Sequence, residues 1–188
     1  MCRYMKNGLK YVIFKTKWGF FGLLADEKYL LRSVLPMKNF NAAKKYLLVG
    51  MFKGAKEDKN MYPQLRKAIT DYYKGNYVNF KKLKFELNRD NITNFAKKVL
   101  NACKDITICQ TSTYGQIAEK CGVPKAARAA GTVLAANNLP LLIGCHRVIR
   151  SDGKIGQFSA AGGSKTKRKM LEHEKQILKN KGVNDECD

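Results

Sequence analysis

Apolar residues alternate with turn signals near the start of the chain. The runs LKYVIF, FFGLLA and YLLRSVL lie within residues 9–35 and are separated by KTKWG and DEK. Short runs rich in aromatic and branched side chains, bounded by turn residues, are typical of strands. The pattern therefore predicts a three-stranded antiparallel meander.

Helical spacing of apolar positions follows the predicted strands. Residues 41–53 show this spacing, and so do residues 62–74, where four apolar side chains share one face: Leu65, Ala68, Ile69 and Tyr72. The next stretch, 76–89, is rich in lysine and reads as irregular or strand-like. We expect it to link an N-terminal α/β part to a second part of the chain.

The second part opens with the clearest amphipathic helix of the chain, with Asp90 or Asn91 as its expected cap. Its apolar side chains recur at helical spacing: Ile92, Phe95, Ala96, Val99, Leu100 and Cys103. Because Cys103 lies on this apolar face, we expect it to be a buried thiol.

Two short helices are predicted next, over residues 113–121 and 125–136. The sequence TYGQ at 113–116 has the capping-box pattern, and Gly122 ends the first helix before Pro124 opens the second. Such a pair forms a helix-turn-helix. The second helix is built from small residues around Arg128, which suits either insertion into a nucleic-acid groove or close packing against a neighbouring helix.

The apolar run LPLLIGCHRVI at 139–149 predicts a buried strand interrupted at Gly144. A turn and a glycine-rich loop follow it. A last helix is expected from a cap at Ser164 to about Asn180, with Gly182 as its stop. Its predicted apolar positions are Met170, Leu171, Ile177 and Leu178.

A cysteine and a histidine, Cys145 and His146, stand side by side in this apolar run. A thiol becomes a nucleophile when a neighbouring base takes its proton, and a histidine base works best when a carboxylate orients it. Glu172 on the predicted last helix is the candidate carboxylate. The alternative is that Cys145 is a small buried hydrophobe and Glu172 a solvated surface residue.

The net positive charge of the chain indicates a class of binding partner. The chain has 36 basic and 15 acidic residues and a formal net charge of +21, which favours binding to nucleic acid. The abundance of lysine and asparagine could equally reflect nucleotide bias in the genome. We therefore treat nucleic-acid binding as favoured by composition alone.

Metal-binding and membrane patterns are absent from the sequence. No two of the six cysteines form a Cys-x-x-Cys pair and there are two histidines, so no metal site is expected. We expect no other cofactor either. No apolar run approaches the roughly 18 residues that a membrane span needs. The first ten residues have no apolar signal core. We expect a cytoplasmic protein, or a nuclear one if the source is eukaryotic.

The residues around Cys145 resemble a known family. IGCHRV at 143–148 is similar to the active-site signature Ile/Val-Pro-Cys-His-Arg-Val of the methylated-DNA–protein-cysteine methyltransferases, the 6-O-alkylguanine-DNA alkyltransferase family. Other blocks match in order: TYGQIAEKCGVPKAARAAG at 113–131, NNLPLLI at 137–143, GKIGQFSAAGG at 153–163 and KRKMLEHE at 167–174. The resemblance is strong over 90–182. Gly144 stands where the family usually has proline, and Phe158 where some members have tyrosine.

The resemblance implies a two-domain fold. Residues 1–89 would form an α/β support domain, ribonuclease H-like, with an antiparallel sheet plus helices. Residues 90–188 would form a mainly helical domain with a winged-helix-like helix-turn-helix, which binds DNA and carries the alkyl acceptor.

The resemblance also implies an activity, that of a methylated-DNA–protein-cysteine S-methyltransferase on double-stranded DNA. Cys145 would attack the alkyl carbon on the 6-oxygen of an extruded guanine, and His146, oriented by Glu172, would accept the thiol proton through a water. Tyr114 would donate to the purine as guanine leaves. Because the thioether is stable, each molecule would act once, as a monomer and without a cofactor.

The remaining site residues fall into two groups by their implied roles. Arg128 would fill the stack left by the extruded nucleotide, within a DNA-binding set that also includes Thr113, Lys125, Ala127, Ala129 and Gly131. Asn137 would brace the turn before the acceptor, and main-chain groups at Cys145, Val148 and Ser159 would read the guanine edge. The pocket and its support would be completed by Pro140, Arg147, Gly156 and Phe158.

Three other functions remain open. A lesion-binding relative without transfer would lack the acceptor, which Cys145 argues against. A helix-turn-helix regulator would need base-reading side chains, and the small-residue helix has few. A thiol hydrolase would turn over and would not need the net charge of +21.

Overall fold

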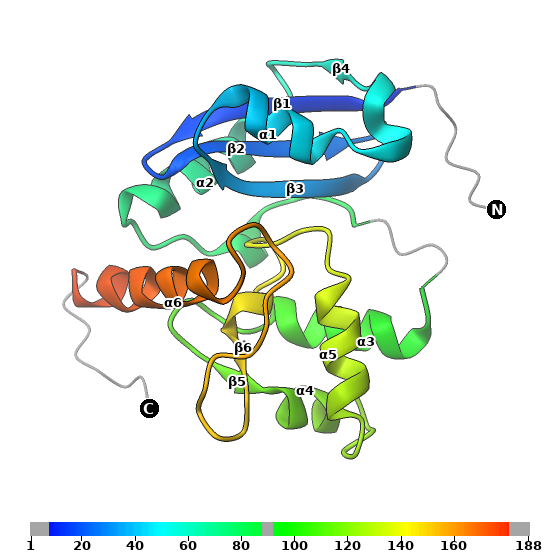
Figure 1. Cartoon of the computed structure of the whole chain (residues 1–188), viewed down its shortest axis with the longest axis vertical. Coiled ribbons are helices and arrows are strands. Elements are labelled where there is room, and N and C mark those ends of the chain that lie inside the picture. The colour runs from blue at the N-terminus through cyan, green and yellow to red at the C-terminus, as the bar shows by residue number, and fades with distance from the viewer. Residues whose placement is uncertain (1–7, 88–91, 181–188) are drawn as a thin grey trace. The chain divides into compact units, whose positions relative to one another are not determined.

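The computed structural model describes residues 8–87 and 92–180 (Figure 1). The chain divides into two compact units, Met1–Lys74 with Leu83–Asn88, and Gly75–Lys82 with Arg89–Asp188. The stretch expected to be a linker is therefore shared, with residues 75–82 packing in the second unit. Among the described residues, none of the helices has the length and apolar character needed to cross a membrane.

The first unit contains the predicted meander. Strands β1 (Lys10–Thr16), β2 (Gly19–Ala25) and β3 (Leu30–Met37) pair antiparallel in sequence order. A two-residue strand, β4 (Lys56–Glu57), adds to the far side of β1 in parallel, so the sheet order is β3-β2-β1-β4. The expectation of a purely antiparallel sheet is corrected here: the sheet is mixed.

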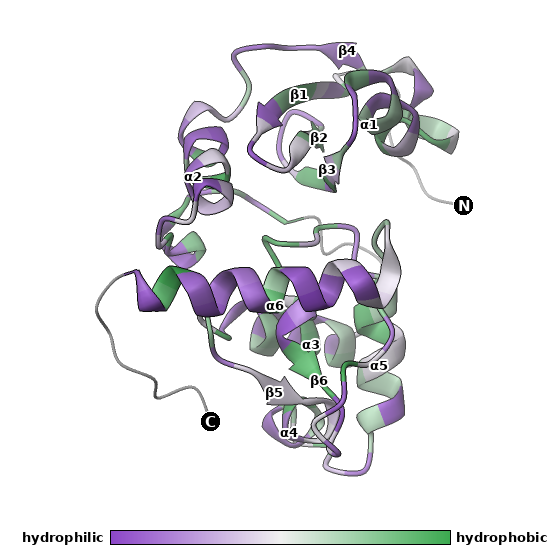
Figure 2. Cartoon of the chain, turned by 60° about the vertical axis from the view of Figure 1, so that its left-hand side comes forward, coloured by the Kyte–Doolittle hydropathy of each residue, from purple (hydrophilic) through white to green (hydrophobic). Residues whose placement is uncertain are grey.

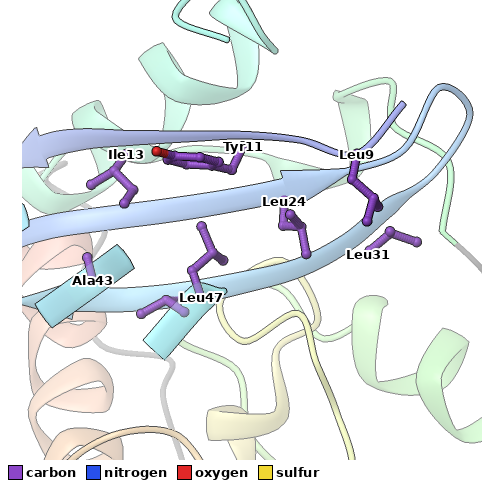
Figure 3. Packing of buried hydrophobic residues seen from close by; sticks show 8 residues of the cluster. Leu9, Tyr11, Ile13, Leu24, Leu31, Ala43 and Leu47 are labelled. Atoms are coloured by element: carbon purple, nitrogen blue, oxygen red, sulfur yellow. The ribbon is translucent and has the colours of Figure 1, made fainter. Parts of the chain in front are cut away.

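Helices cover both faces of this sheet. Helix α1 (Phe40–Leu47) packs Ala43 and Leu47 against Tyr11 and Ile13 of β1, as Figure 3 shows. Because side chains alternate along a strand, Phe14 faces the other way. That face receives helix α2 (Pro63–Lys74), whose Arg66 guanidinium lies 5.5 Å from the Phe14 ring.

The helix expected over residues 41–53 is shorter than predicted. Helix α1 ends at Leu47, and the chain continues into the 3₁₀ helix η1 (Gly50–Gly54). The interruption coincides with Gly50, whose φ of +58° lies in the left-handed region that favours glycine.

The second unit is mainly helical. Helix α3 (Asn94–Lys104) is capped by Thr93, whose side chain accepts from Ala96 N; the expected caps Asp90 and Asn91 lie outside the described residues. Cys103 is buried, as predicted. The other elements are η2 (Phe80–Lys82), β5 (Ser112–Thr113), α4 (Tyr114–Lys120), α5 (Ala127–Ala135), η3 (Cys145–Arg147), β6 (Val148–Ile149) and α6 (Gly163–Lys179).

Helices α4 and α5 form the predicted helix-turn-helix. Thr113 and Gln116 make the full capping box at the start of α4, and Gly122 in the turn has a φ of +82°. Helix α5 begins at Ala127, two residues later than expected, so Pro124 lies in the turn and not in the helix. Strands β5 and β6 pair in parallel beside this motif.

Residues 139–147 are buried but do not form the predicted strand; within the run, only β6 (Val148–Ile149) is a strand. Ile143 N donates to Leu139 O at 2.9 Å and Cys145 N donates to Ile143 O at 2.7 Å, so the backbone folds into successive turns. Leu141 has a φ of +75°, which interrupts any extended conformation. An apolar run indicates burial, and it does not by itself distinguish a strand from other buried backbone.

Helix α6 starts one residue before the expected cap. Gly162, with a φ of +84°, occupies the cap position, and Ser164 Oγ instead donates to Gly156 O at 3.4 Å. Its surface is largely hydrophilic (Figure 2). The buried stripe is narrow and consists of Lys167, Met170, Glu174 and Ile177. Two of these four side chains, Lys167 and Glu174, are charged. The expected stop at Gly182 lies outside the described residues.

Candidate active site

A cavity of about 660 Å³ opens within the second unit and reaches Cys145. Seven predicted site residues line it: Tyr114, Arg128, Gly131, Cys145, Gly156, Phe158 and Ser159. Seven further lining residues did not feature in the sequence prediction: Thr132, Leu134, Ala135, Arg150, Ile155, Gln157 and Ser164. A cavity of this size suits a small aromatic ligand.

Cys145 is buried at the start of η3, with 6% of its surface exposed. Asn137 Nδ2 lies 3.0 Å from Cys145 Sγ and donates to it. The same amide group also donates to Ile143 O at 3.4 Å, while its oxygen accepts from Leu139 N at 2.9 Å. Asn137 therefore joins the sulfur to the turn that carries it.

Two opposing effects act on the Cys145 thiol. Burial raises its pKa, because the interior disfavours the charged thiolate. The hydrogen bond from Asn137 and the positive charges of Lys167 and Arg147 lower the pKa in part. The thiol is thus protonated at neutral pH, and it needs a base to become a nucleophile.

His146 is the neighbouring base, and its carboxylate partner is Glu174. His146 Nε2 lies 2.8 Å from Glu174 Oε1, and both side chains are fully buried. The prediction that Glu172 orients His146 is wrong: Glu172 is exposed and lines a different cavity. Two residues along a helix turn the side chain by about 200°, so Glu172 and Glu174 occupy opposite faces of α6.

The pKa shifts define the state of this pair. Burial lowers the pKa of His146, so the imidazole is neutral, and its Nε2–H donates to the carboxylate, which can only accept. Burial would raise the pKa of Glu174, but its interactions with His146, which donates a hydrogen bond to it, and with the positively charged Arg147 outweigh burial and hold that pKa well below its usual range. His146 Nδ1 has no hydrogen-bond partner among the described residues. It is therefore the ring nitrogen free to accept a proton.

Arg147 holds the carboxylate from the other side. Its Nε lies 3.0 Å from Glu174 Oε2 and its Nη2 lies 2.8 Å from Oε1, while Nη1 donates to Ile106 O at 2.7 Å. Cys109 N also donates to Glu174 Oε2, at 3.2 Å. Glu174 is thus a buried, paired charge that ties α6 to η3 and to the segment after α3.

Tyr114 lies in a close-fitting cage on the cavity wall. A Cβ atom at Gly131 would lie 3.7 Å from its ring, and one at Gly156 would lie 3.1 Å from its hydroxyl oxygen. Lys167 Nζ lies 3.5 Å from the same oxygen. Burial raises the pKa of Tyr114, so its hydroxyl is a proton donor at neutral pH.

The expected DNA-binding residues lie on or beside the helix-turn-helix. Arg128, Ala129 and Lys125 are exposed and Ala127 is half-buried, whereas Thr113 serves as the cap of α4. Of the expected DNA-binding residues, Arg128 and Gly131 also line the cavity. The start of α5 thus carries small side chains around one exposed arginine, Arg128.

Two expected pocket residues are placed differently. Pro140 and Val148 are buried and are not among the residues that line the cavity, because Pro140 sits inside the 139–143 turn and Val148 lies in β6. Gly144 has a φ of −70°, and a Cβ there would lie 3.1 Å from Arg147 Cδ. Within residues 8–87 and 92–180, no group of three or more potential metal ligands is found.

Comparison of the sequence with known proteins gives matches to one family, and the family model matches within the second unit. The family model described as "6-O-methylguanine DNA methyltransferase, DNA binding domain" matches residues 94–176. The methylated-DNA–protein-cysteine methyltransferase of Mus musculus is 46% identical over 81 residues, which are 43% of this chain and 38% of that protein. That of Mycobacterium bovis is 40% identical over 83 residues, or 44% of this chain and 49% of that protein. The chain thus spans less than half the length of these curated relatives.

Solved structures match over both units. The crystal structure of Mycobacterium tuberculosis O6-methylguanine methyltransferase has a TM-score of 0.69 and 25% identity, covering 90% of this chain and 94% of that one. The M. tuberculosis OGT structure in complex with DNA has a TM-score of 0.70 and 25% identity, covering 89% and 94%. The order of a sheet with helices followed by a helical part is therefore shared with these proteins.

Proposed function

The chain belongs to the 6-O-methylguanine DNA methyltransferase family, and from this premise we propose that it repairs alkylated guanine in duplex DNA by moving the alkyl group to its own Cys145. The observation that carries the proposal is the position of Cys145. Its sulfur lies at a cavity wall and accepts a hydrogen bond from Asn137 at 3.0 Å, and the next residue in the chain, His146, is buried and paired with Glu174.

The proposed transfer is a single displacement at carbon. The Cys145 proton passes through one water to Nδ1 of His146, and Glu174 stabilises the imidazolium that results. The sulfur electron pair then forms the bond to the alkyl carbon as the bond between that carbon and the guanine 6-oxygen breaks. The electrons of the broken bond go to the purine, which takes a proton from the Tyr114 hydroxyl.

The product explains why the protein would act once. A thioether has no bond that water readily cleaves, and among the described residues that line the cavity there is no second thiol that could take the alkyl group. We therefore propose one transfer per molecule, by a monomer and without a cofactor.

Duplex DNA containing alkylated guanine is the proposed partner. The reacting carbon lies within the base stack, so the nucleotide must be extruded, which costs a few kcal/mol. Arg128, exposed on the small-residue helix α5, is proposed to occupy the vacated space. We further propose that the first unit is ribonuclease H-like, that the helix-turn-helix is winged-helix-like, and that the protein works in the cytoplasm or the nucleus, wherever the DNA is.

Intact mass after incubation with a duplex containing one 6-O-methylguanine tests the proposal. We expect one methyl group in place of one hydrogen, mapped to Cys145, never more than one per molecule, and none in Cys145→Ala. An unchanged mass with retained preference for the lesion would identify a lesion-binding protein instead. If the mass is unchanged and the protein does not prefer duplex that contains the lesion, the proposed function is refuted and only the description of the fold stands.

A further inference from the structure

Lys167 is a lysine with no exposed surface, on the buried stripe of α6. Its Nζ lies 2.5 Å from Val148 O and 3.5 Å from Tyr114 Oη, and 5.6 Å from the centre of the Tyr114 ring. Among the described residues, neither hydrogen-bond partner of Lys167 is a carboxylate. A buried ammonium without a counter-charge is costly, and such groups concentrate at functional sites.

We propose, building on the alkyl transfer proposed above, that Lys167 is a positioning residue for this reaction: its ammonium directs the Tyr114 hydroxyl toward the substrate purine and stabilises the negative charge that forms at Cys145 and Tyr114. The buried charge of Lys167 thereby gains a role. Neither the hydrogen-bonded His146 and Glu174 nor the helix proposed to bind DNA uses this charge.

The direction of the tyrosine proton follows from donor chemistry. A lysine ammonium has three donors and no acceptor, so the Tyr114 oxygen must accept from Lys167. The tyrosine's own hydrogen then points elsewhere, and Tyr114 lines the cavity. Lys167 therefore leaves the hydroxyl free to donate into the space where the purine would sit.

The ammonium also acts on the charges of the reaction. Its positive charge lowers the pKa of Cys145 and so favours the thiolate. When Tyr114 gives its proton to the purine, the phenolate remains next to the ammonium, which then donates a stronger hydrogen bond. Lys167 keeps its own proton throughout, so the proton balance of the transfer does not change.

The contact with Val148 fixes the acceptor segment. The Val148 carbonyl follows η3 directly, and Lys167 is on α6, so the bond ties this strand to the helix. Besides each other, Cys145 and Lys167 interact with four charged or titratable groups: Arg147, Cys103, Tyr114 and His146.

Three variants separate the charge from the hydrogen bond. Lys167→Gln keeps a donor for the Val148 carbonyl but removes the charge, Lys167→Met removes both, and Lys167→Arg keeps the charge. Lys165→Gln, at an exposed position of the same helix, is the matched control. For each we would measure the single-turnover transfer rate from methylated duplex, and the pH profile of Cys145 alkylation by iodoacetamide.

We expect Lys167→Gln and Lys167→Met to slow transfer at least about tenfold. They should also raise the pH midpoint of Cys145 alkylation by at least about half a unit, because a nearby positive charge is lost. Lys167→Arg should keep the wild-type midpoint, and Lys165→Gln should match wild type in both assays. A purely structural lysine would change the amount of folded protein without moving the midpoint.

The inference is overturned if the folded neutral variants keep the wild-type rate and midpoint, or if Lys167→Arg shifts the midpoint as far as Lys167→Gln does. Should one neutral variant fail to fold, the other carries the comparison. The iodoacetamide profile needs no DNA. A wild-type protein that fails to demethylate DNA would therefore refute the proposed function, while the midpoint would still report on the charge of Lys167.

Discussion

The side-chain amide of Asn137 joins Cys145 Sγ, at 3.0 Å, to the turn that presents it. The same side chain bonds Ile143 O and Leu139 N, the two ends of that turn. One residue therefore determines both where the sulfur lies and how well its negative charge is solvated. Position and reactivity of the nucleophile are coupled through a single amide.

Asn137→Ala should weaken both properties. The turn loses buried hydrogen bonds, which should lower the free energy of unfolding by about 1–3 kcal/mol in urea titrations. The pKa of Cys145 should rise, because its hydrogen-bond donor is gone, so alkylation by iodoacetamide should require higher pH. Asn138→Ala, at the exposed neighbouring position, is the control and should behave as wild type. An unmoved pH profile in Asn137→Ala would contradict this role.

Glu174→Gln should be far more damaging than Glu172→Gln. Removing the buried carboxylate leaves the Arg147 guanidinium without its partner, which typically costs about 3–5 kcal/mol of stability. The exposed Glu172 should change unfolding by no more than about 0.5 kcal/mol. Chemical denaturation of the two variants, with single-turnover transfer rates, makes the comparison. If Glu172→Gln lost as much stability and transfer rate as Glu174→Gln, the assignment of Glu174 as the carboxylate that orients His146 would be contradicted.

The pH dependence of stability should carry the signature of Glu174. Its pKa is lowered on folding, so its stabilising contribution is complete above its unfolded value near 4.5 and is lost as the pH falls below it. The difference in unfolding free energy between wild type and Glu174→Gln should therefore shrink on acidification below that pH. A difference that stays constant from neutral pH to strongly acidic pH would show that the carboxylate is not ionised in the fold.

Gly156→Ala should displace Tyr114. The added Cβ would lie 3.1 Å from the tyrosine oxygen and 3.2 Å from Cε2, so the ring must move. The ring has to shift by only a few tenths of an ångström. Since a misplacement of about 1 Å can cost about 100-fold in rate, we expect a loss of transfer of up to about tenfold, with little change in melting temperature. Gly54→Ala, where the new Cβ meets nothing within 4 Å, is the control. Unchanged transfer in Gly156→Ala would mean that Tyr114 need not stay where it is.

Gly144→Pro and Gly144→Ala form a matched pair. Both add a Cβ about 3.1 Å from Arg147, but only proline fixes φ, and the observed φ of −70° already suits proline. The proline variant should exceed the alanine variant by about 0.4–1 kcal/mol in unfolding free energy, because its unfolded chain is more restricted. It should also transfer the alkyl group faster. Equal stability of the two would show that the glycine does not loosen the acceptor segment.

Arg128→Ala should impair transfer from duplex DNA alone. Extruding the nucleotide costs a few kcal/mol, and a side chain that fills the vacated space offsets part of this cost. Without that side chain we expect transfer to be at least about tenfold slower. Alkylation of Cys145 by iodoacetamide should be unchanged. Arg168→Ala removes an exposed arginine from α6, so it controls for the loss of one charge. An equal loss in both variants would reduce Arg128 to a general electrostatic contribution.

The parts of the fold that sequence could predict are those governed by local patterns. Alternation predicts the meander, and the capping box at Thr113 and Gln116 predicts the start of α4 correctly. Strand β4 gives no such signal, because it is two polar residues, Lys56 and Glu57, whose pairing with β1 is set by tertiary contacts.

The candidate site was predictable where a residue's chemistry is enough to identify it. Cys145 and His146 stand out because a thiol and an imidazole are adjacent. Glu174 and Lys167 do not, because charged side chains on a helix are ordinarily solvated. Their spacing from Met170, three residues before and four after, is the signal that both face the interior.

The pairing of His146 with Glu174 has a consequence for synthesis of the chain. Cys145 leaves the ribosome well before α6, which carries both Glu174 and Lys167. Until that helix docks, the nascent thiol has neither an oriented base nor a neighbouring cation. The proposed acceptor thiol would therefore gain its reactivity only when the last helix is in place, and an incomplete chain would react little with small electrophiles in the cell.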